Sequence, residues 1–207
     1  MKQTNVAKAT LSRLPVYLQY LRDPKSGLGT NVSATIIARA LGLGEVQVRK
    51  DLASVSGIGR PKIGYNTAEL TKCLEHFLGY DQKSTAILVG AGRMGRALLG
   101  YDGFDHYGLE IVAAFDKDNR KTARDISGKN IYPVDEMAAF CAENNIRIGI
   151  ITVPGDVAQE VCDQLIACGI KAIWNFAPVT LNVPQGVNVS QENLALSLAY
   201  LNIQSNL

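Results

Sequence analysis

The hydrophobic residues of this chain follow two different patterns, one in each part of the sequence. Up to residue 78 they recur every three or four positions, which is typical of amphipathic helices. Beyond residue 84, short unbroken apolar runs alternate with segments of helical periodicity, which predicts buried parallel strands connected by helices. Helices are expected at residues 11–21, 34–41, 45–54, 68–78, 96–99, 136–144, 157–168 and 191–203, and strands at 85–89, 109–115, 131–134, 146–153, 171–174 and 187–189.

Several expected helices begin beside a side chain that can accept a hydrogen bond from a free backbone N–H. We assign this capping role to Ser12, Ser33, Thr67 and Asp135. Pro15 is interpreted as a first-turn residue, because proline is tolerated in that position. Residues 118–129 are expected to be irregular or weakly helical.

A glycine-rich turn follows the first apolar run. It reads Gly90, Ala91, Gly92, Arg93, Met94 and Gly95, the GxGxxG spacing of a dinucleotide-binding loop. The first glycine allows the tight turn, the second lets the backbone approach a pyrophosphate, and the third lets the helix pack closely on the strand. Asp116 ends the second run about 20 residues later, where a carboxylate accepts hydrogen bonds from a ribose diol. Strand, turn, helix, strand and acid occur in the order that a dinucleotide site requires.

Asp116 also favours NAD(H) over NADP(H), because a carboxylate repels a ribose phosphate. The neighbouring Lys117 and Arg120 weaken this preference. In a doubly wound sheet the ligand binds at the carboxyl ends of the strands. The other strand ends that we assign to the cofactor site are Thr152, Val153, Pro154, Asn175, Phe176, Ala177 and Pro178.

Two short helices joined by a glycine turn, at residues 34–41 and 45–54, predict a helix-turn-helix. One face of the second helix carries Val46, Val48 and Leu52, which are expected to face the core, and the other carries Gln47, Arg49 and Lys50. Arginine can pair with guanine, glutamine with adenine, and lysine with phosphate or guanine. The alternative interpretation is an ordinary helical hairpin within a bundle.

The next segment, residues 56–65, is rich in glycine, basic, and ends on Tyr65. It predicts a hairpin wing whose Arg60 and Lys62 enter a minor groove or contact phosphates. An exposed loop with incidental charge is the alternative. The charge distribution is asymmetric: residues 1–84 carry 12 Lys and Arg against 6 Asp and Glu, whereas residues 85–207 carry 9 against 13. A basic first part is expected to meet a polyanion.

The cysteine spacing and the lengths of the apolar runs argue against metal-binding, secreted and membrane proteins. The four cysteines, Cys73, Cys141, Cys162 and Cys168, show neither a CxxC pair nor metal-binding spacing, which favours reduced thiols in the cytoplasm and no metal. A thiol switch between Cys162 and Cys168 is left open. We expect no signal peptide and no membrane-spanning segment.

The predicted nucleotide site has no obvious catalytic group, and no catalytic residue is assigned. The chain has two histidines, His76 and His106, and neither falls at a strand end. A site that binds a cofactor without reacting with it, joined to a basic winged helix, indicates a sensor rather than an enzyme. The alternatives are an NAD-dependent oxidoreductase with an N-terminal extension, and a DNA-binding protein whose nucleotide is structural.

We therefore predict an α/β protein in three parts. A winged helix-turn-helix occupies residues 1–80, a Rossmann-like doubly wound parallel sheet residues 81–188, and a dimerisation helix residues 189–207. The last helix is apolar around its whole circumference, with Leu194, Leu196, Leu198, Leu201 and Ile203. Such a helix should be buried, either on a second protomer or on its own sheet.

The chain resembles the Rex family of redox-sensing transcriptional repressors. The runs that carry the resemblance are LSRL at residues 11–14 with YL at 17–18, QVRKDL at 47–52, GYN at 64–66, GAGRMG at 90–95, FDKD at 115–118, TVP at 152–154 and NFAP at 175–178. They occur in order and span nearly the whole chain. The combination of QVRKDL, GxGxxG and NFAP is specific.

The resemblance implies a homodimer that binds double-stranded DNA at an inverted-repeat operator. NADH would release it and NAD+ would compete, Tyr101 would lie near the nicotinamide, and the last helix would swap between protomers. The set that we assign to DNA contact is Arg13, Ser33, Gln47, Arg49, Lys50, Arg60, Lys62 and Tyr65.

This sequence departs from the family pattern at a few positions. A charged pair that the family uses in one state of the switch is matched here by the amides Gln19 and Asn193. An amide pair lacks charge assistance and is about half as strong. The family run DLSYFG is replaced at residues 51–57, which affects the packing expected under the wing.

Overall fold

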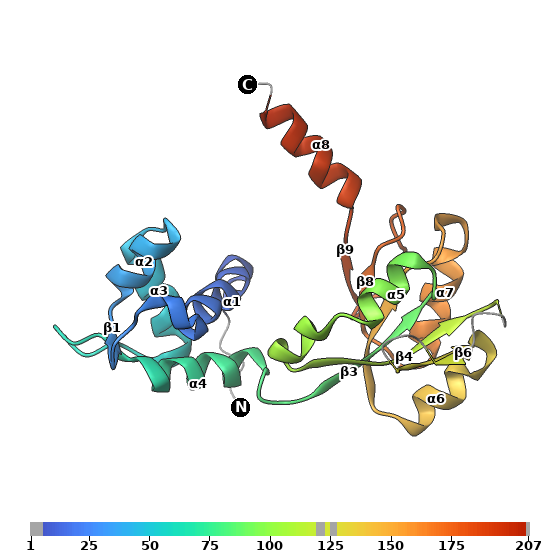
Figure 1. The fold of residues 1–207 in the computed structure, drawn as a ribbon, viewed down its shortest axis with the longest axis horizontal. Helices are drawn as coiled ribbons and strands as arrows, with labels where there is room; N and C mark the ends of the chain where they lie inside the picture. Colours follow the sequence, from blue (N-terminus) through green and yellow to red (C-terminus); the bar gives the residue numbers. More distant parts are fainter. Residues whose placement is uncertain (1–5, 119–122, 125–127, 206–207) are drawn as a thin grey trace. The chain divides into compact units, whose positions relative to one another are not determined.

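The computed structural model describes residues 6–118, 123–124 and 128–205 (Figure 1). Contacts divide the chain into two compact units, Met1–Gln82 and Lys83–Leu207. No helix within the described residues is both long and apolar enough to cross a lipid bilayer.

The N-terminal unit is mainly helical. Its elements are α1 (Lys8–Arg22), the 3-10 turn η1 (Pro24–Ser26), β1 (Asn31–Val32), α2 (Ala34–Leu41), α3 (Glu45–Ser56), β2 (Tyr65–Asn66) and α4 (Thr67–Leu78). The helices enclose one core, which includes Leu14, Tyr17, Ile37, Val48, Leu52 and Leu74. Strand β2 pairs antiparallel with β1 and so returns the chain from the wing to the helices. The helix-turn-helix prediction is confirmed, with Gly42 in the left-handed conformation after α2.

Four sequence-based predictions in this unit are wrong. Pro15 lies in the middle of α1, which begins four residues before Ser12, and Ser12 donates to the Ala9 carbonyl instead of capping the helix. Helix α1 therefore lacks one main-chain hydrogen bond at Pro15, and tertiary packing of its apolar face outweighs that loss. Asn66, not Thr67, caps α4 by accepting from the Glu69 N–H, and Val46 is 62% exposed because the core side of α3 is formed by Val48, Asp51 and Leu52.

The second unit is built around a seven-stranded sheet. Its strands are β3 (Ser84–Val89), β4 (Leu109–Asp116), β5 (Ala123–Arg124), β6 (Asn130–Pro133), β7 (Ile146–Ile151), β8 (Ala172–Asn175) and β9 (Asn188–Gln191). Their order is β5-β6-β4-β3-β7-β8-β9, and all neighbours are parallel except β5 with β6. Without β5 this is the strand order of a dinucleotide-binding fold, with its topological switch between β3 and β7. The Rossmann-like prediction is confirmed.

Alternate residues of β3 face the two layers that cover the sheet. Ile87 and Val89 lie in a core with α6 (Met137–Glu143) and α7 (Gly155–Ala167). Ala86 and Leu88 lie in a second core with α5 (Arg93–Leu99). The period of two along a strand produces this division, and burial on both faces explains why the runs are continuously apolar. The 3-10 turns η2 (Asp102–Tyr107) and η4 (Val134–Glu136) complete the connections.

All four α-helices that the structure describes in this unit start at residues other than those expected, and α5 and α7 begin early, at Arg93 and Gly155 instead of residues 96 and 157. Asp135 lies within η4 and makes no capping hydrogen bond, so α6 begins only at Met137. The last helix, α8 (Leu194–Gln204), begins three residues later than expected, because β9 extends through Gln191 and Asn193 provides the cap. Within residues 118–129, which were expected to be irregular or weakly helical, the described pair Ala123–Arg124 forms the short strand β5.

Candidate functional site

The turn between β3 and α5 is shaped by two glycines that no other residue could replace without movement. Gly90 has φ 105°, and a Cβ there would lie 2.8 Å from the carbonyl of Thr152. A Cβ on Gly95 would lie 2.0 Å from the Gly90 carbonyl oxygen. Gly92 differs, because a Cβ there would meet no atom within 4 Å. The space beside Gly92 is open to a ligand, as the expected role of the second glycine requires.

Asp116 holds this turn in place. Its side chain is almost entirely buried, and Oδ2 accepts from the backbone N–H of Ala91 at 2.8 Å. Oδ1 accepts from the N–H of Asp118 at 2.9 Å. The acid thus anchors the loop, a role that the sequence reasoning did not assign to it.

A cavity of about 520 Å³ opens at the carboxyl ends of β3, β4 and β7. Its size falls within the usual range for small-molecule sites. The predicted cofactor residues that line it are Gly90, Gly92, Asp116, Lys117, Thr152, Val153 and Pro154. Further residues of β3, η4 and α7 line the cavity and were not predicted from the sequence, namely Val89, Val134, Val157, Glu160, Val161 and Gln164. Val89, Val134 and Val157 could have been found from their positions at strand ends and at the start of α7, whereas Glu160, Val161 and Gln164 lie further along that helix.

The other predicted cofactor residues lie outside this lining. Ala91 in the turn and Gly95 in α5 are buried, and Arg93 and Met94 are exposed on α5. Asn175 and Ala177 are buried, with Asn175 hydrogen-bonded to its own turn, while Pro178 is exposed. Phe176 contacts Trp174, and Tyr101 is 58% exposed beside Phe104. Arg120 lies outside the described residues. Their contact with a nucleotide stays a prediction.

The second candidate site is the exposed face of α3. Gln47, Arg49 and Lys50 are all exposed, as expected of residues that read DNA. Arg49 forms an ion pair with Glu45 one turn earlier. Such exposed pairs contribute about 0–1 kcal/mol, so DNA can displace Glu45 at little cost. A groove of about 640 Å³ beside α3 brings Gln47 and Lys50 together with Arg13 of α1.

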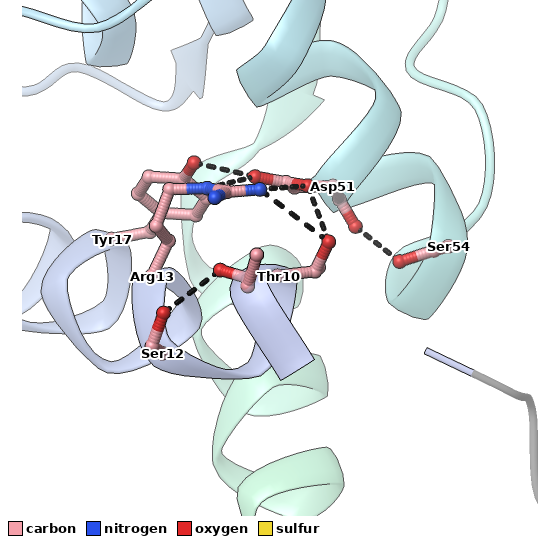
Figure 2. A network of polar contacts seen from close by, with 7 residues as sticks. Thr10, Ser12, Arg13, Tyr17, Asp51 and Ser54 are labelled. Atoms are coloured by element: carbon pink, nitrogen blue, oxygen red, sulfur yellow. Dashed lines mark hydrogen bonds and ion pairs between the residues drawn. The ribbon is translucent and has the colours of Figure 1, made fainter. Parts of the chain in front are cut away.

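Arg13 is held by an ion pair that the sequence reasoning missed (Figure 2). Asp51 of α3 is almost fully buried, and its carboxylate accepts from Arg13 Nε at 2.8 Å and Arg13 Nη2 at 3.0 Å. Tyr17 Oη and Thr10 Oγ1 donate to the same carboxylate at 2.7 and 2.8 Å. The network joins α1 to α3. The signal was a single acid, Asp51, at a core position of an amphipathic helix.

The network shifts the pKa values of its members. Burial alone would raise the pKa of Asp51, but hydrogen bonds from Arg13, Tyr17 and Thr10 outweigh it and lower that pKa below its ordinary value. Burial, reinforced by the Asp51 carboxylate, raises the pKa of Tyr17 to about 12. The hydrogen bond to Asp51 also raises the pKa of Arg13, so the guanidinium stays charged.

These shifts predict how stability depends on pH. The contribution of Asp51 is present above the pKa of an unfolded aspartate, about 4, and is lost as the pH falls through the lower folded value. The contribution of Tyr17 is complete below the unfolded pKa of about 10 and is lost as the pH rises through the folded value. Urea unfolding between pH 8 and 12 measures the alkaline loss. Tyr17→Phe should reduce this alkaline dependence, and an unchanged profile in that variant would contradict the assignment.

The wing is a tight hairpin. Arg60 and Gly64 exchange two backbone hydrogen bonds of 2.8 and 2.9 Å, and Lys62 lies at the tip with φ 65°. Arg60 and Lys62 are exposed, as predicted for residues that contact DNA. Tyr65 and Ser33 have structural contacts instead: the Tyr65 ring covers Gly59, and Ser33 caps α2. A DNA role for these two side chains stays a prediction.

Helix α8 exposes its apolar side chains in the single chain. The exposed fractions of Leu194, Leu196, Leu198, Tyr200, Leu201 and Ile203 all lie between 59% and 69%, and none of its described residues is buried. Docking on its own sheet, one of the two expected arrangements, is not what the structure has. The four cysteines are free thiols, and Cys162 is completely buried.

Comparison with known families matches two models to the two units. Residues 5–53 match the family described as "Putative DNA-binding protein N-terminus", and residues 81–179 match the CoA binding domain. Among solved structures, RSP in complex with β-NAD+ and operator DNA is 34% identical with a TM-score of 0.91, covering 97% of this chain and 93% of that one. RSP in complex with β-NADH is also 34% identical, with a TM-score of 0.86, and the match covers 99% of this chain and 96% of that one.

Relatives that match over nearly the whole chain show higher sequence identity. The redox-sensing transcriptional repressor Rex of Treponema denticola is 39% identical over 205 residues, 99% of this chain and 98% of that protein. Rex of Porphyromonas gingivalis is 42% identical over 198 residues, 96% of this chain and 91% of that protein. Both units and both candidate sites fall within these matches, and the chain therefore belongs to the Rex family of redox-sensing transcriptional repressors.

Proposed function

We propose that this protein is a transcriptional repressor that senses the NADH/NAD+ ratio. As a homodimer it binds an inverted-repeat operator, and NADH releases it. The observation that carries this proposal is the similarity, over 97% of the chain, to RSP bound to β-NAD+ and operator DNA together. Residues 1–80 bind DNA, residues 81–188 bind NAD(H), and the helix within residues 189–207 is the dimer contact. The protein acts in the cytoplasm and catalyses no reaction on its cofactor.

The physical basis of the response is a difference in affinity. NADH must bind the DNA-incompetent geometry of the dimer more tightly than the competent one, since equal affinity for both would shift nothing. The two recognition helices must lie about one helical turn of DNA apart, or a multiple of it, to read two half-sites. Exchange of α8 between protomers buries the apolar side chains that a single chain exposes.

Fluorescence anisotropy of the protein on labelled inverted-repeat DNA from its own upstream region tests the proposal. NADH and then NAD+ are titrated at one fixed salt concentration, because DNA affinities depend steeply on salt. Release by NADH but not by NAD+ is the expected result. DNA binding that ignores both nucleotides would make the nucleotide structural. No specific DNA binding at all would favour the oxidoreductase alternative, which a substrate screen under NADH turnover would then examine.

Two substitutions in the DNA-binding unit are expected to differ in kind. Arg49→Ala removes a guanidinium from the recognition face, so operator affinity should fall by about 1–3 kcal/mol and base preference should relax. Lys62→Ala removes a phosphate contact, so binding to every sequence should weaken and the slope of log K against log salt should fall by about 0.9. Titration of operator and scrambled DNA at several salt concentrations distinguishes the two. Equal losses on both DNAs for Arg49→Ala would contradict its role in reading bases.

A further inference from the structure

Two amide side chains connect the turn after β8 to the last residue of β9. Asn175 has no exposed surface, and its Nδ2 donates to Gln191 Oε1 at 2.7 Å. Gln191 Nε2 in turn donates to the carbonyl oxygen of Ala177 at 2.8 Å. The backbone N–H of Glu192 donates to the Asn175 carbonyl at 2.8 Å. The NFAP turn and the segment that enters α8 are therefore tied together beyond the last ladder pair of the two strands, Asn175 with Gln191.

A second connection runs through aromatic rings to the same segment. Trp174, the single tryptophan of the chain, donates its indole N–H to Glu192 Oε1 at 3.0 Å. Its ring centroid lies 5.9 Å from that of Phe104, in an edge-on arrangement. Phe104 makes a similar contact with Tyr101, at 5.0 Å. A row of three rings thus leads from the exposed Tyr101 to the residue that stands two positions before α8.

Both connections run from predicted cofactor residues to the same segment before α8. One end comprises Tyr101, which the family resemblance places near the nicotinamide, and the NFAP turn, which is assigned to the cofactor site. The other end is Gln191 and Glu192, which precede the Asn193 cap of α8. Glu192 is half-buried, and a carboxylate that accepts from an indole makes a charge-assisted hydrogen bond, about twice as strong as a neutral one. Simple anchoring of β9 would need only the backbone ladder that it already has with β8.

We infer that Gln191 and Glu192 are positioning residues that couple the nucleotide site to α8, the helix proposed as the dimer contact. Movement of the NFAP turn or of Tyr101 makes or breaks the contact between Trp174 and Glu192, and this contact sets the direction in which α8 leaves the sheet. The inference rests on the proposed function, because it needs a dimer whose geometry follows nucleotide occupancy. Neither Gln191 nor Glu192 lines the cavity, so both would act on nucleotide binding without contacting the nucleotide there.

The test measures a coupling factor, the ratio of the NADH dissociation constants with and without operator DNA. Glu192→Leu removes the acceptor of the Trp174 indole and should reduce this factor by about 2- to 30-fold, the range found for residues that transmit coupling without contacting a ligand. Glu192→Gln keeps a carbonyl acceptor at the same position and should recover most of the coupling. Gln159→Leu is the matched control, since Gln159 ties α7 to the Asn182 backbone elsewhere in the same unit. It should leave the factor unchanged.

A spectroscopic readout separates coupling from stability. Because the chain has one tryptophan, protein labelled with 5-fluorotryptophan gives one 19F resonance, which reports on Trp174 alone. NADH should shift this resonance in the wild type and in Glu192→Gln, and much less in Glu192→Leu. If Glu192→Leu kept both the coupling factor and the NADH-induced 19F shift of the wild type, the inference would be overturned while the proposed function would stand. A wild-type protein that stays on the operator whatever the NADH concentration would overturn the proposed function, and the inference with it.

Discussion

Replacement of Asp51 by alanine is expected to lower the free energy of unfolding of the N-terminal unit by about 3–5 kcal/mol. The substitution removes the acceptor of four hydrogen bonds and leaves the Arg13 guanidinium without its partner. The Arg13 side chain retains 23% exposure, so water can reach part of it and the loss should lie near the lower end of that range. For a domain of this size 3 kcal/mol corresponds to a fall in Tm of roughly 12–24 °C.

Operator binding should fail together with stability in this variant, because the network fixes α3 against α1. Thermal unfolding followed by circular dichroism, with anisotropy on operator DNA, measures both effects. NADH binding by the second unit should persist, which shows that the rest of the chain is folded. Asp81→Ala is the matched control: its carboxylate pairs with His76 at the surface, where 40% of the aspartate side chain is exposed. That change should cost less than about 1 kcal/mol. A comparable loss in both variants would show that burial of the Asp51 network is not what stabilises the unit.

The elements that the sequence predicted well are those in which local pattern and tertiary packing agree. A fixed spacing relates the run at residues 85–89, the glycine turn and Asp116, and each position requires a particular residue type. The amino-acid sequence alone therefore predicts β3, the turn and β4. The α2–α3 pair was recognisable for the same reason, since Ser33 and Gly42 mark both ends of α2. Apolar runs without polar alternation indicated strands covered on both faces.

The features that sequence reasoning missed depend on contacts between distant residues. Arg13 was assigned to DNA contact with the rest of that set, and its ion-pair partner Asp51 lies 38 residues away in sequence. Asn175 was assigned to the cofactor as a polar residue at a strand end, but its amide is bonded within the turn and to Gln191. Pro15 suggested a helix start because the local preference of proline was considered without the packing of α1. These contacts form in three dimensions, and the one-dimensional pattern does not reveal them; the DNA role of Arg13 and the cofactor role of Asn175 stay predictions.

Gly92→Ala is expected to abolish most of the NADH response while leaving the protein folded. A Cβ at this position would meet no atom of the chain within 4 Å, so stability should change by no more than about 0.5 kcal/mol. The open space beside Gly92 is where the backbone must approach a pyrophosphate, and a methyl group would fill it. Forcing a methyl group into a packed contact costs about 1–3 kcal/mol, which corresponds to a loss in NADH affinity of roughly 5- to 150-fold. Operator binding without nucleotide should equal that of the wild type.

Gly95→Ala provides the contrast that makes this result specific. Its Cβ would lie 2.0 Å from the Gly90 carbonyl oxygen and 2.9 Å from Thr152 Oγ1, so the glycine turn must move even in the absence of nucleotide. The second unit should therefore lose stability by about 1–3 kcal/mol in addition to losing NADH binding. Isothermal titration with NADH, together with thermal unfolding, compares the two variants. The methyl group of Gly92→Ala needs no rearrangement of the folded chain and would therefore stay in the space assigned to the pyrophosphate. If this variant bound NADH like the wild type, the pyrophosphate would not pass over this turn.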